Sequence, residues 1–348
     1  MDVNKLFLGT TMLKAISLVK PVPSWFKDRY FKNIDTTDQA KVTIEIYQDN
    51  EQVAPWVHHS IGGQLLERKG GQVKEYEPKE VAPMRITTVD DCLTASVNEY
   101  VTGSKTPEQR AQALYAKDIR ELMNSIDRRE EVSISEILTQ GKLTQKGKGI
   151  DEVLDFWSQD PSEKPYKKLA GTSVWSNANS NPIADLRAAQ AWSLKKTGIK
   201  PNEATLGSDA AQALLDNVEF LKKLDIKNYR SAEIDIREIT YGVTYLGRVI
   251  ELGLDLYSYD REVKLDDQED KVPLMPVNSV LLGSPEVPTT LVYGVTAIID
   301  KTAGTKKFYS LPRVPFSKME DAGRYVGIKS KPLPIVHQPQ AFYVLEVL

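Results

Sequence analysis

Histidine is the side chain that most readily does acid–base or metal chemistry near neutral pH, and this chain has three. His58 and His59 are adjacent in a run with strand character, so their side chains should point to opposite faces and cannot easily share one metal ion. His337 lies in a proline-rich extended segment, where we expect a packing role. We therefore expect no nucleophilic triad and no histidine metal site.

The segment Gly141–Gly149, with the sequence GKLTQKGKG, is the nearest approach to a phosphate-binding loop. It has five residues between its first two glycines, where that loop has four, and Gly149 stands where a serine or threonine should bind magnesium. It also follows a predicted helix instead of a strand. We predict a solvated hairpin tip here.

Two other features could carry chemistry. The acidic run Leu265–Asp270 lacks the ligand order and central glycine of a calcium loop, so we expect a charged loop tip. Cys92 has no neighbouring cation that would favour a reactive thiolate, and we expect a small buried apolar side chain. The sequence predicts no catalytic residue, no metal site and no cofactor, although many enzyme sites carry no local motif.

Composition narrows the function classes further. The 348 residues include 45 basic and 48 acidic side chains, a formal net charge of −3 that argues against binding nucleic acid by charge neutralisation. The single cysteine excludes an intramolecular disulfide and is typical of a reducing compartment such as a bacterial cytoplasm. No stretch approaches the roughly 18 consecutive apolar residues that span a bilayer. We expect a soluble protein that is not exported.

The first third of the chain contains parts that cannot bury themselves. Residues 1–40 have too little apolar periodicity to form a core alone and are predicted to form an arm. Alternation then predicts a strand at Val42–Ile46. Between about Val57 and Pro83, two Gly-Gly pairs separate short alternating runs, which predicts a long hairpin that should pack on another subunit.

A long helix is the strongest predicted element. Thr106, Pro107 and Gln109 supply an N-cap, a first-turn proline and a capping-box partner. An apolar stripe at helical spacing continues from there to Gly141, a C-cap residue. This predicts about 34 residues, roughly 50 Å, with a polar face that stays exposed to solvent.

The rest of the chain mixes helices and strands. Helices are predicted from Pro182 to Lys196 and from Ala210 to Leu224, with a short strand between them at Ala204–Leu206. Strands separated by glycine and proline follow from Ser231 onward. The pattern is that of an α+β chain whose projecting arm and hairpin imply an assembly.

In this order of elements, short motifs resemble the lambda-type major capsid proteins, the major capsid protein E family of tailed phages. They are Tyr30-Phe31, Asp35-Thr36, Ala54–Val57, Gly70-Gly71, Tyr76–Pro78, Val81–Pro83, Ile137–Leu143, Val174–Ser176, Asn278–Gly283 and Ser330–Pro334. Each motif is short, and their collinear order over nearly the whole chain carries the resemblance.

The resemblance implies the Hong Kong 97 capsid fold with five regions. They are an N-terminal arm at 1–40, an extended-loop hairpin at 41–90, a peripheral domain at 91–200 with its spine helix at 107–140, an axial domain at 201–300, and return strands at 301–348. It also implies candidate subunit-contact residues, which are Trp56, Gly70, Gly71, Tyr76 and Pro78. No lysine–asparagine cross-linking pair can be assigned.

The function implied is that of a major capsid protein, which assembles through pentamers and hexamers into an icosahedral shell around double-stranded DNA. Its partners would be copies of itself, a scaffolding protein supplied in trans, a portal and often a decoration protein, with no specific DNA binding and no membrane. It would be assembled in the cytoplasm of a bacterial host and end in the virion. Two alternatives stay open: an encapsulin-like compartment shell, and an enzyme whose site has no motif.

Overall fold

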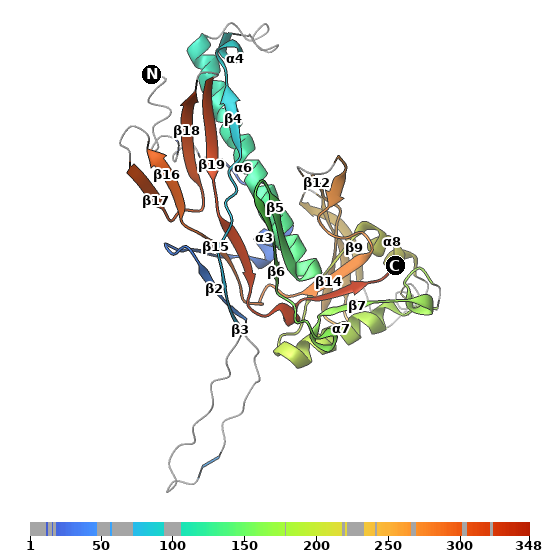
Figure 1. Ribbon diagram of the computed structural model, residues 1–348. Helices are drawn as coiled ribbons and strands as arrows, with labels where there is room; N and C mark the ends of the chain where they lie inside the picture. Colours follow the sequence, from blue (N-terminus) through green and yellow to red (C-terminus); the bar gives the residue numbers. More distant parts are fainter. Residues whose placement is uncertain are drawn as a thin grey trace.

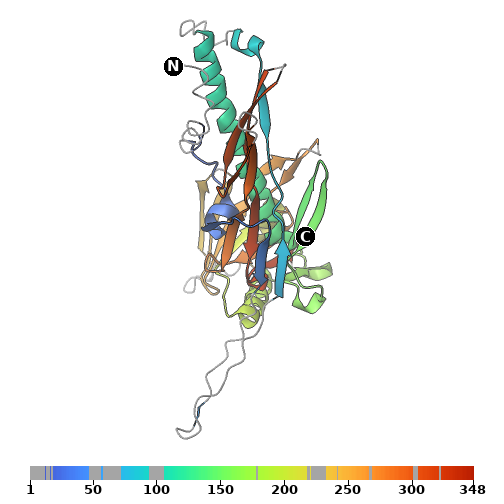
Figure 2. The ribbon, with the colours of Figure 1, turned by 60° about the vertical axis from the view of Figure 1, so that its left-hand side comes forward.

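The computed structural model shows an L-shaped molecule with two lobes (Figure 1). Turned by 60°, the same molecule is narrow, so the chain forms a flat plate (Figure 2). The structure describes residues 12, 16, 19–46, 56–57, 72–93, 106–177, 179–217, 220, 233–240, 242–265, 269–300, 305–320 and 323–348. No helix within these ranges is long and apolar enough to cross a membrane.

A single helix of 34 residues, α6 (Pro107–Gln140), runs along the first lobe and confirms the predicted long helix at both ends. Thr106 accepts a hydrogen bond from the backbone N–H of Gln109, and the Gln109 side chain accepts one from the backbone of Thr106. This capping box satisfies donors that a helix start leaves open. At the other end Gly141 adopts φ +67°, the left-handed conformation that terminates helices.

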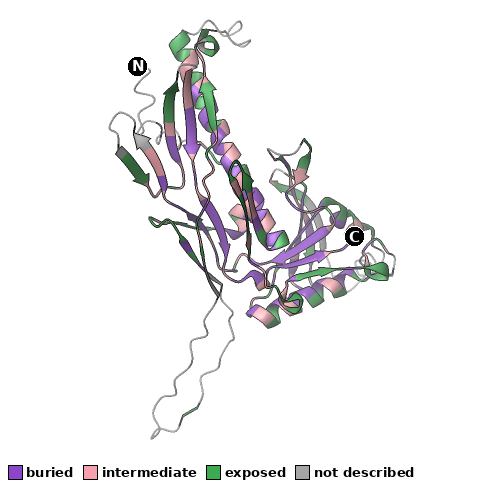
Figure 3. Cartoon of the chain, in the orientation of Figure 1, coloured by how far each residue is buried: buried purple, intermediate pink, exposed green. Residues whose placement is uncertain are grey.

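The apolar face of α6 packs on a three-stranded antiparallel sheet. In spatial order its strands are β18 (Val314–Glu320), β19 (Gly323–Lys329) and β4 (Met84–Thr87). Ile119, Leu122 and Ile126 of the helix are buried in one cluster with Val326 and Ile328 of β19. Burial of each such side chain contributes about 1.5 to 3 kcal/mol, so this contact fixes the sheet to the helix. Figure 3 shows the buried stripe along α6.

The C-terminal half of α6 enters the largest hydrophobic cluster of the described residues. This cluster includes side chains of β15 (Thr289–Tyr293) and β20 (Pro332–Val336), which form a second three-stranded sheet with the exposed edge strand β1 (Asn33–Thr36). The short helix α3 (Trp25–Tyr30) adds Trp25, Phe26 and Tyr30, all buried. The helix α3 and Phe31 of the predicted arm therefore lie in the chain's own core, because their aromatic side chains are clustered within two turns, whereas the β1 strand that follows is exposed.

The second lobe is built on a seven-stranded sheet. In spatial order its strands are β7 (Tyr166–Lys168), β21 (Tyr343–Glu346), β14 (Ser279–Gly283), β8 (Glu203–Leu206), β11 (Leu254–Tyr259), β10 (Val243–Val249) and β9 (Glu233–Thr240). Val280 and Leu282 of β14 join one hydrophobic cluster, while Leu281 joins the cluster at the end of α6. The central strands are therefore buried on both faces, and the two lobes share a core.

Two helices supply the outer layer of this lobe. The first, α7 (Pro182–Thr197), confirms the predicted helix there, with Asn181 as its N-cap and Gly198 at φ +72° as its C-cap. The second, α8 (Ser208–Asp216), ends earlier than the predicted Leu224, so that prediction was wrong. The cause is Asn217, whose buried side chain donates to the Trp175 carbonyl and accepts from the backbone N–H of Phe220. A side chain with those partners ends one element and begins the next.

Shorter elements complete the described part of the chain. They are the strand pairs β2 (Val42–Ile46) with β3 (Gln72–Tyr76), β5 (Lys142–Gly147) with β6 (Ile150–Asp155), β12 (Glu262–Lys264) with β13 (Lys271–Pro273), and β16 (Thr296–Asp300) with β17 (Thr305–Tyr309), the helix α4 (Val89–Leu93), and single 3-10 turns at Pro161–Glu163, Gly171–Ser173 and Pro339–Ala341. The β5–β6 hairpin confirms the exposed hairpin tip predicted at Gly141–Gly149.

Substitution of Gly141 tests how α6 ends. A Cβ atom at this position would overlap the indole ring of Trp157, and alanine also resists the left-handed conformation. We expect Gly141→Ala to lower the free energy of unfolding by about 2 to 5 kcal/mol, which combines backbone strain and overpacking.

Gly149→Ala is the matched control, because Gly149 has φ +78° but no atom lies within 4 Å of its Cβ position. Its free energy of unfolding should fall by only about 1 to 2 kcal/mol, the cost of placing alanine in the left-handed conformation. Urea unfolding of both variants, followed by circular dichroism, gives the comparison. Equal losses at the two positions would show that contact with Trp157 is unimportant.

Candidate subunit-contact site

The foot of the predicted hairpin is fixed to the chain's own fold. Strands β2 and β3 pair in antiparallel register, with Val42 opposite Tyr76. The hydroxyl of Tyr76 donates a hydrogen bond to Gln145 Oε1 of β5 at 2.6 Å. Burial, together with the nearby Glu152 carboxylate, raises the pKa of Tyr76 to about 12. Lys79 Nζ lies 2.9 Å from a Glu152 oxygen, so β3 and the segment after it are tied to the β5–β6 hairpin.

Pro78 is buried two residues beyond Tyr76. Its ring packs on Gly294, where a Cβ atom would lie 3.2 Å from Pro78 Cγ. The backbone N–H of Gly294 in turn donates to the carbonyl of Lys331 at 2.9 Å. The structure thus brings two of the five candidate contact residues, Tyr76 and Pro78, to one place, and their visible contacts are within the chain. A role for them in subunit contacts stays a prediction.

The other candidates differ in what can be said of them. Trp56 is 103% exposed, and its neighbour Val57 is 43% exposed. Gly70 and Gly71 lie outside the described residues, as do His58 and His59. Large apolar side chains are rarely left fully exposed in a contiguous patch unless a partner covers them. Trp56 is therefore the candidate whose exposure most favours a contact with another chain.

One face of the β18–β19–β4 sheet is a second exposed apolar surface, which sequence reasoning missed. Arg85 of β4 faces α6, where its guanidinium lies 3.3 Å from an Asp118 oxygen and 2.5 Å from a Glu121 oxygen. Its neighbours Met84 and Ile86 therefore face away from the helix, and they are 59% and 38% exposed. The alternation of Met84, Arg85 and Ile86 could have indicated this arrangement, had β4 been recognised as a strand.

Three carboxylates of α6 form a buried cluster. The prediction that the polar face of α6 stays in solvent is therefore wrong for this part of the helix. Asp127, Glu130 and Glu131 are each at most 1% exposed. Glu131 accepts hydrogen bonds from the backbone N–H groups of Phe26 at 2.8 Å and Lys27 at 3.0 Å, which belong to the first turn of α3. Its carboxylate therefore supplies the acceptor that α3 lacks, because the N-cap Ser24 makes no side-chain capping bond.

The other two carboxylates are neutralised by cations from distant parts of the chain. Lys27 Nζ lies 2.6 Å from Glu130, and one Arg313 nitrogen lies 2.6 Å from Asp127 and 3.0 Å from Glu130. The Tyr293 hydroxyl donates to Glu130 at 3.0 Å. Burial by itself would weaken the Arg313 charge, but the two carboxylates raise the pKa of this guanidinium, which stays protonated. The cluster joins α3, α6, β15 and the start of β18.

The sequence did contain a signal for this cluster. The predicted apolar stripe of α6 has a gap between Ile126 and Ile134, although both of these side chains are fully buried. A helix that is buried on both sides of a polar turn must bury that turn as well. The cations could not be found in this way, because Lys27 and Arg313 lie 103 and 183 residues from Glu130.

The other residues considered for chemistry are accounted for by the fold where they are described. His337 Nε2 lies 3.0 Å from the Thr290 hydroxyl, in keeping with a packing role between β20 and β15. Of the acidic run, only Leu265, Glu269 and Asp270 are described. Within the described ranges, no group of three or more histidine, cysteine, aspartate or glutamate side chains is arranged to hold a metal ion.

The model of one protein family, phage major capsid protein E, matches residues 10–347. The chain belongs to this family. Among solved structures, a prophage protein of E. coli CFT073 assigned as a capsid protein aligns with a TM-score of 0.69 at 18% identity, covering 100% of this chain and 99% of that one. A phage-related protein from Bordetella bronchiseptica RB50 aligns with a TM-score of 0.57 at 12% identity, covering 98% and 97%. No curated protein sequence matches the chain.

Membership of the major capsid protein E family confirms the predicted fold class, an α+β chain of the Hong Kong 97 capsid type. It makes the chain a structural shell protein and not an enzyme. A phage capsid protein is a component of the virion and associates with its own copies. Which surfaces make these contacts stays a prediction, and the exposed apolar side chains at Trp56 and on β4 are candidates.

Substitution of Glu131 tests the carboxylate that caps α3. Glu131→Ala leaves two backbone N–H groups and the Tyr259 hydroxyl without their acceptor, so we expect a loss of about 3 kcal/mol or more. Glu131→Gln keeps an acceptor oxygen and removes a buried charge, so its loss should be much smaller. Urea unfolding at about pH 7 measures both variants.

The pH dependence of the same comparison gives a second readout. Burial raises the pKa of Glu131, against the opposing effect of its hydrogen bonds from Phe26 and Lys27. The folded state then binds this proton more readily than the unfolded state, so the cost of the buried charge falls as pH falls through the raised pKa. Wild type should gain stability relative to Glu131→Gln as pH falls toward the ordinary glutamate pKa of about 4.3. A difference that does not change with pH would contradict a raised pKa.

Proposed function

We propose that copies of this chain assemble through pentamers and hexamers into an icosahedral shell that encloses double-stranded DNA. The partners would be a scaffolding protein, a portal and, where one is present, a decoration protein, with assembly in the cytoplasm of a bacterial host. The match to the capsid protein family over residues 10–347 supports the phage shell over an encapsulin-like compartment.

The observation that carries this proposal is the combination of a fixed foot and an exposed tryptophan in the hairpin. Tyr76 and Pro78 are held by β5 and by Gly294 of the same chain. Between β2 and β3 the chain has residues 47–71, and within them Trp56 is fully exposed. Strands β2 and β3 bury Val42 and Ile44 in the chain's own core, whereas Trp56 has no such burial, so we expect a neighbouring subunit to cover it. This is the role expected of the extended loop at 41–90.

The exposed face of the β18–β19–β4 sheet fits the same proposal. Phe316 of β18 lies where the side chain of residue 327 would be if that residue were not glycine. Gly327 pairs with Met84, so Phe316 and Met84 lie on the same outer face of the sheet. An apolar sheet face of this kind offers a flat surface for an element of an adjacent subunit. We therefore place one subunit contact on this face and one at Trp56.

The regions proposed for the capsid fold show which parts of the subunit the carboxylate cluster joins. We assign the arm to 1–40, the peripheral domain to 91–200, the axial domain to 201–300 and the return strands to 301–348. The carboxylate cluster then joins the arm, the spine helix and the return strands, because Lys27, Glu130 and Arg313 come from these three regions. Such a joint would transmit a movement of the arm to the helix.

Removal of the Trp56 side chain tests the hairpin contact. Because this side chain is fully exposed, Trp56→Ala should change the free energy of unfolding of the isolated subunit by less than about 0.5 kcal/mol. Shell formation should fail at concentrations where the parent assembles, since a weakened contact is repeated across the lattice. Size-exclusion chromatography and negative-stain microscopy measure assembly.

Two further variants show whether a failure to assemble comes from the hairpin itself. A chain in which residues 49–69 are replaced by a short Gly-Ser turn keeps the β2–β3 register, and it should fold but not assemble. Leu194→Ala removes an exposed apolar side chain of α7 and should assemble like the parent. If Trp56→Ala and the shortened chain both form normal shells, the hairpin is not part of the subunit interface.

The dependence of assembly on nucleic acid is a separate test. The net charge of −3 gives the chain no electrostatic reason to need DNA in order to assemble. We expect nuclease-treated subunits, with any scaffolding protein they require, to form closed shells at the same yield with and without added duplex DNA. Strict dependence on DNA would contradict the proposal of a passive container.

A further inference from the structure

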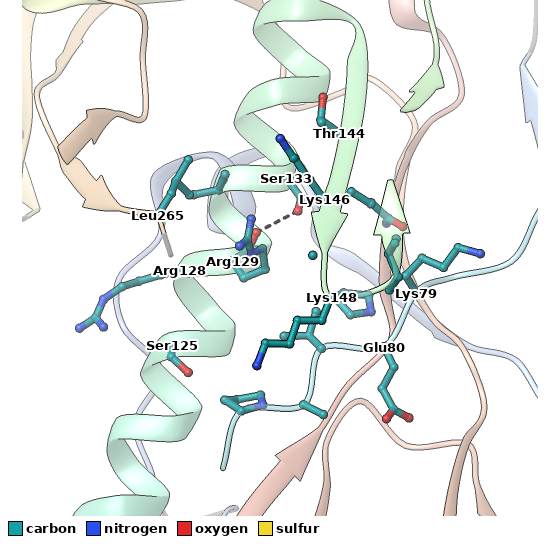
Figure 4. Close-up of a pocket in the computed structure, with 18 of the residues that line it drawn as sticks. Lys79, Glu80, Ser125, Arg128, Arg129, Ser133, Thr144, Lys146, Lys148 and Leu265 are labelled. Carbon is teal, nitrogen blue, oxygen red and sulfur yellow. Dashed lines mark hydrogen bonds between the residues drawn. The ribbon is translucent and has the colours of Figure 1, made fainter. Parts of the chain in front are cut away.

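A cleft of about 630 Å³ opens beside α6 and has no role in the proposed function (Figure 4). Five segments line it: α6, the β5–β6 hairpin, residues 79–83, the strand β12 with Leu265, and Pro332 at the start of β20. These segments are far apart in sequence. The contacts of Tyr76 and Lys79 join residues 79–83 to the hairpin, and the backbone N–H of Thr144 in the hairpin donates to Glu136 of α6. The cleft is therefore a permanent feature of the folded subunit.

The lining of the cleft is strongly basic. Its cations are Arg128, Arg129, Lys146, Lys148 and Lys264, together with Lys79. The single acidic residue of the lining is Glu80, and it forms an ion pair with Lys329 at 2.8 Å. Lys79 is likewise paired, with Glu152. In a chain whose formal net charge is −3, this places six positive side chains and one negative side chain around one concavity.

Five of these cations form no ion pair where the chain is described, although the Glu136 carboxylate on the same helix attracts Arg129 over a longer distance. No carboxylate in the described ranges lies within ion-pair distance of Arg128, Arg129, Lys146, Lys148 or Lys264. Figure 4 shows Lys148 reaching from the hairpin toward α6, and Lys79 pointing the other way. Like charges that converge on a concavity focus a positive potential there, which attracts an anionic ligand.

The cleft also has apolar walls, which narrow the class of ligand. They are Val81, Ala82, Pro83, Val132, Ile150, Val263, Leu265 and Pro332. A DNA duplex presents a uniform row of phosphates on a convex surface and offers no apolar group to such walls. A peptide can place carboxylates against the cations and apolar side chains against the walls at the same time. The mixture therefore favours an acidic peptide over nucleic acid.

The chain's own acidic run, Leu265–Asp270, begins at the rim and is the nearest competitor for the cleft. Glu269 and Asp270, the two acidic residues of that run that are described, form no ion pair with the five cations. Lys264 directly precedes the run and is likewise unpaired where the chain is described. The described half of the run thus leaves the cations available.

We propose that this cleft binds an acidic peptide segment of another protein, in which carboxylate and apolar side chains alternate along a short stretch. The carboxylates of the peptide would be attracted by the cations, and its apolar side chains would pack on the apolar walls. Binding would not require that a shell has formed. A partner that acts on free subunits before assembly could use such a site.

The test uses unassembled subunit and a fluorescent synthetic peptide of about a dozen residues that mixes glutamate and leucine. A matched peptide carries glutamine in place of every glutamate, and a short DNA duplex is the third probe. We expect the glutamate peptide to bind at least roughly ten-fold more tightly than the glutamine peptide, with an affinity that falls as salt rises.

Variants of the chain locate the binding. Lys146→Glu with Lys148→Glu should weaken binding of the glutamate peptide by roughly ten-fold or more. Both side chains are exposed at the hairpin tip, so the fold should tolerate the change, and the milder pair Lys146→Gln with Lys148→Gln covers the case in which it does not. Lys195→Glu with Lys200→Glu is the matched control, since both lysines are exposed outside the cleft, and it should bind like the parent.

Three results would overturn the proposal. They are equal binding of the two peptides, tighter binding of the duplex through the same lysines, or binding that survives both pairs of substitutions at 146 and 148. Shell formation is scored separately for every variant, so that a failure to assemble is not mistaken for a failure to bind. If the chain binds the peptide but forms no shell, the proposed peptide site stands and the proposed shell function is contradicted.

Discussion

Three adjacent carboxylates buried in the middle of α6 constrain the rest of this fold. A buried carboxylate is unfavourable unless hydrogen bonds or cations compensate it, so Asp127, Glu130 and Glu131 must keep their partners. Those partners are the first turn of α3, the side chain of Arg313, and hydroxyls of the tyrosines at 259 and 293. None of these elements can move away alone without leaving a charge or a donor unsatisfied. The cluster therefore fixes how the two lobes meet.

Local pattern was enough to predict the elements that local interactions determine. The ends of α6 follow from Thr106, Gln109 and Gly141, whose capping roles need only neighbours in sequence. The same holds for α7, which is capped by Asn181 at its start and by Gly198 at its end. The family resemblance supplied the capsid fold, which no single local motif determines.

What sequence reasoning missed depends on partners that are distant in the chain. The end of α8 is set by Asn217, whose side chain bonds to Trp175, 42 residues away. The burial of Glu130 depends on Arg313. The basic cleft could not be predicted from the sequence, because its cations lie on α6, on β5–β6, on β12 and in the segment after β3, and only the fold brings these segments together. The candidates Tyr76 and Pro78 were found at the hairpin foot, but their contacts within the chain could not be foreseen.

The seven-stranded sheet has a consequence for how a subunit is made. Its inner strand β14 lies between β8 and β21, so Leu281 is paired with both Thr205 and Val344. The strands β8, β14 and β21 are far apart in the sequence. Pairing them is slow, because the entropy lost in closing the long intervening loops must be overcome before the paired strands are stabilised. A newly made chain would thus spend time with β8 and β14 exposed as unpaired edges, which are prone to join the wrong partner. The supply of competent subunits, and with it the rate at which shells nucleate, would then be limited by folding.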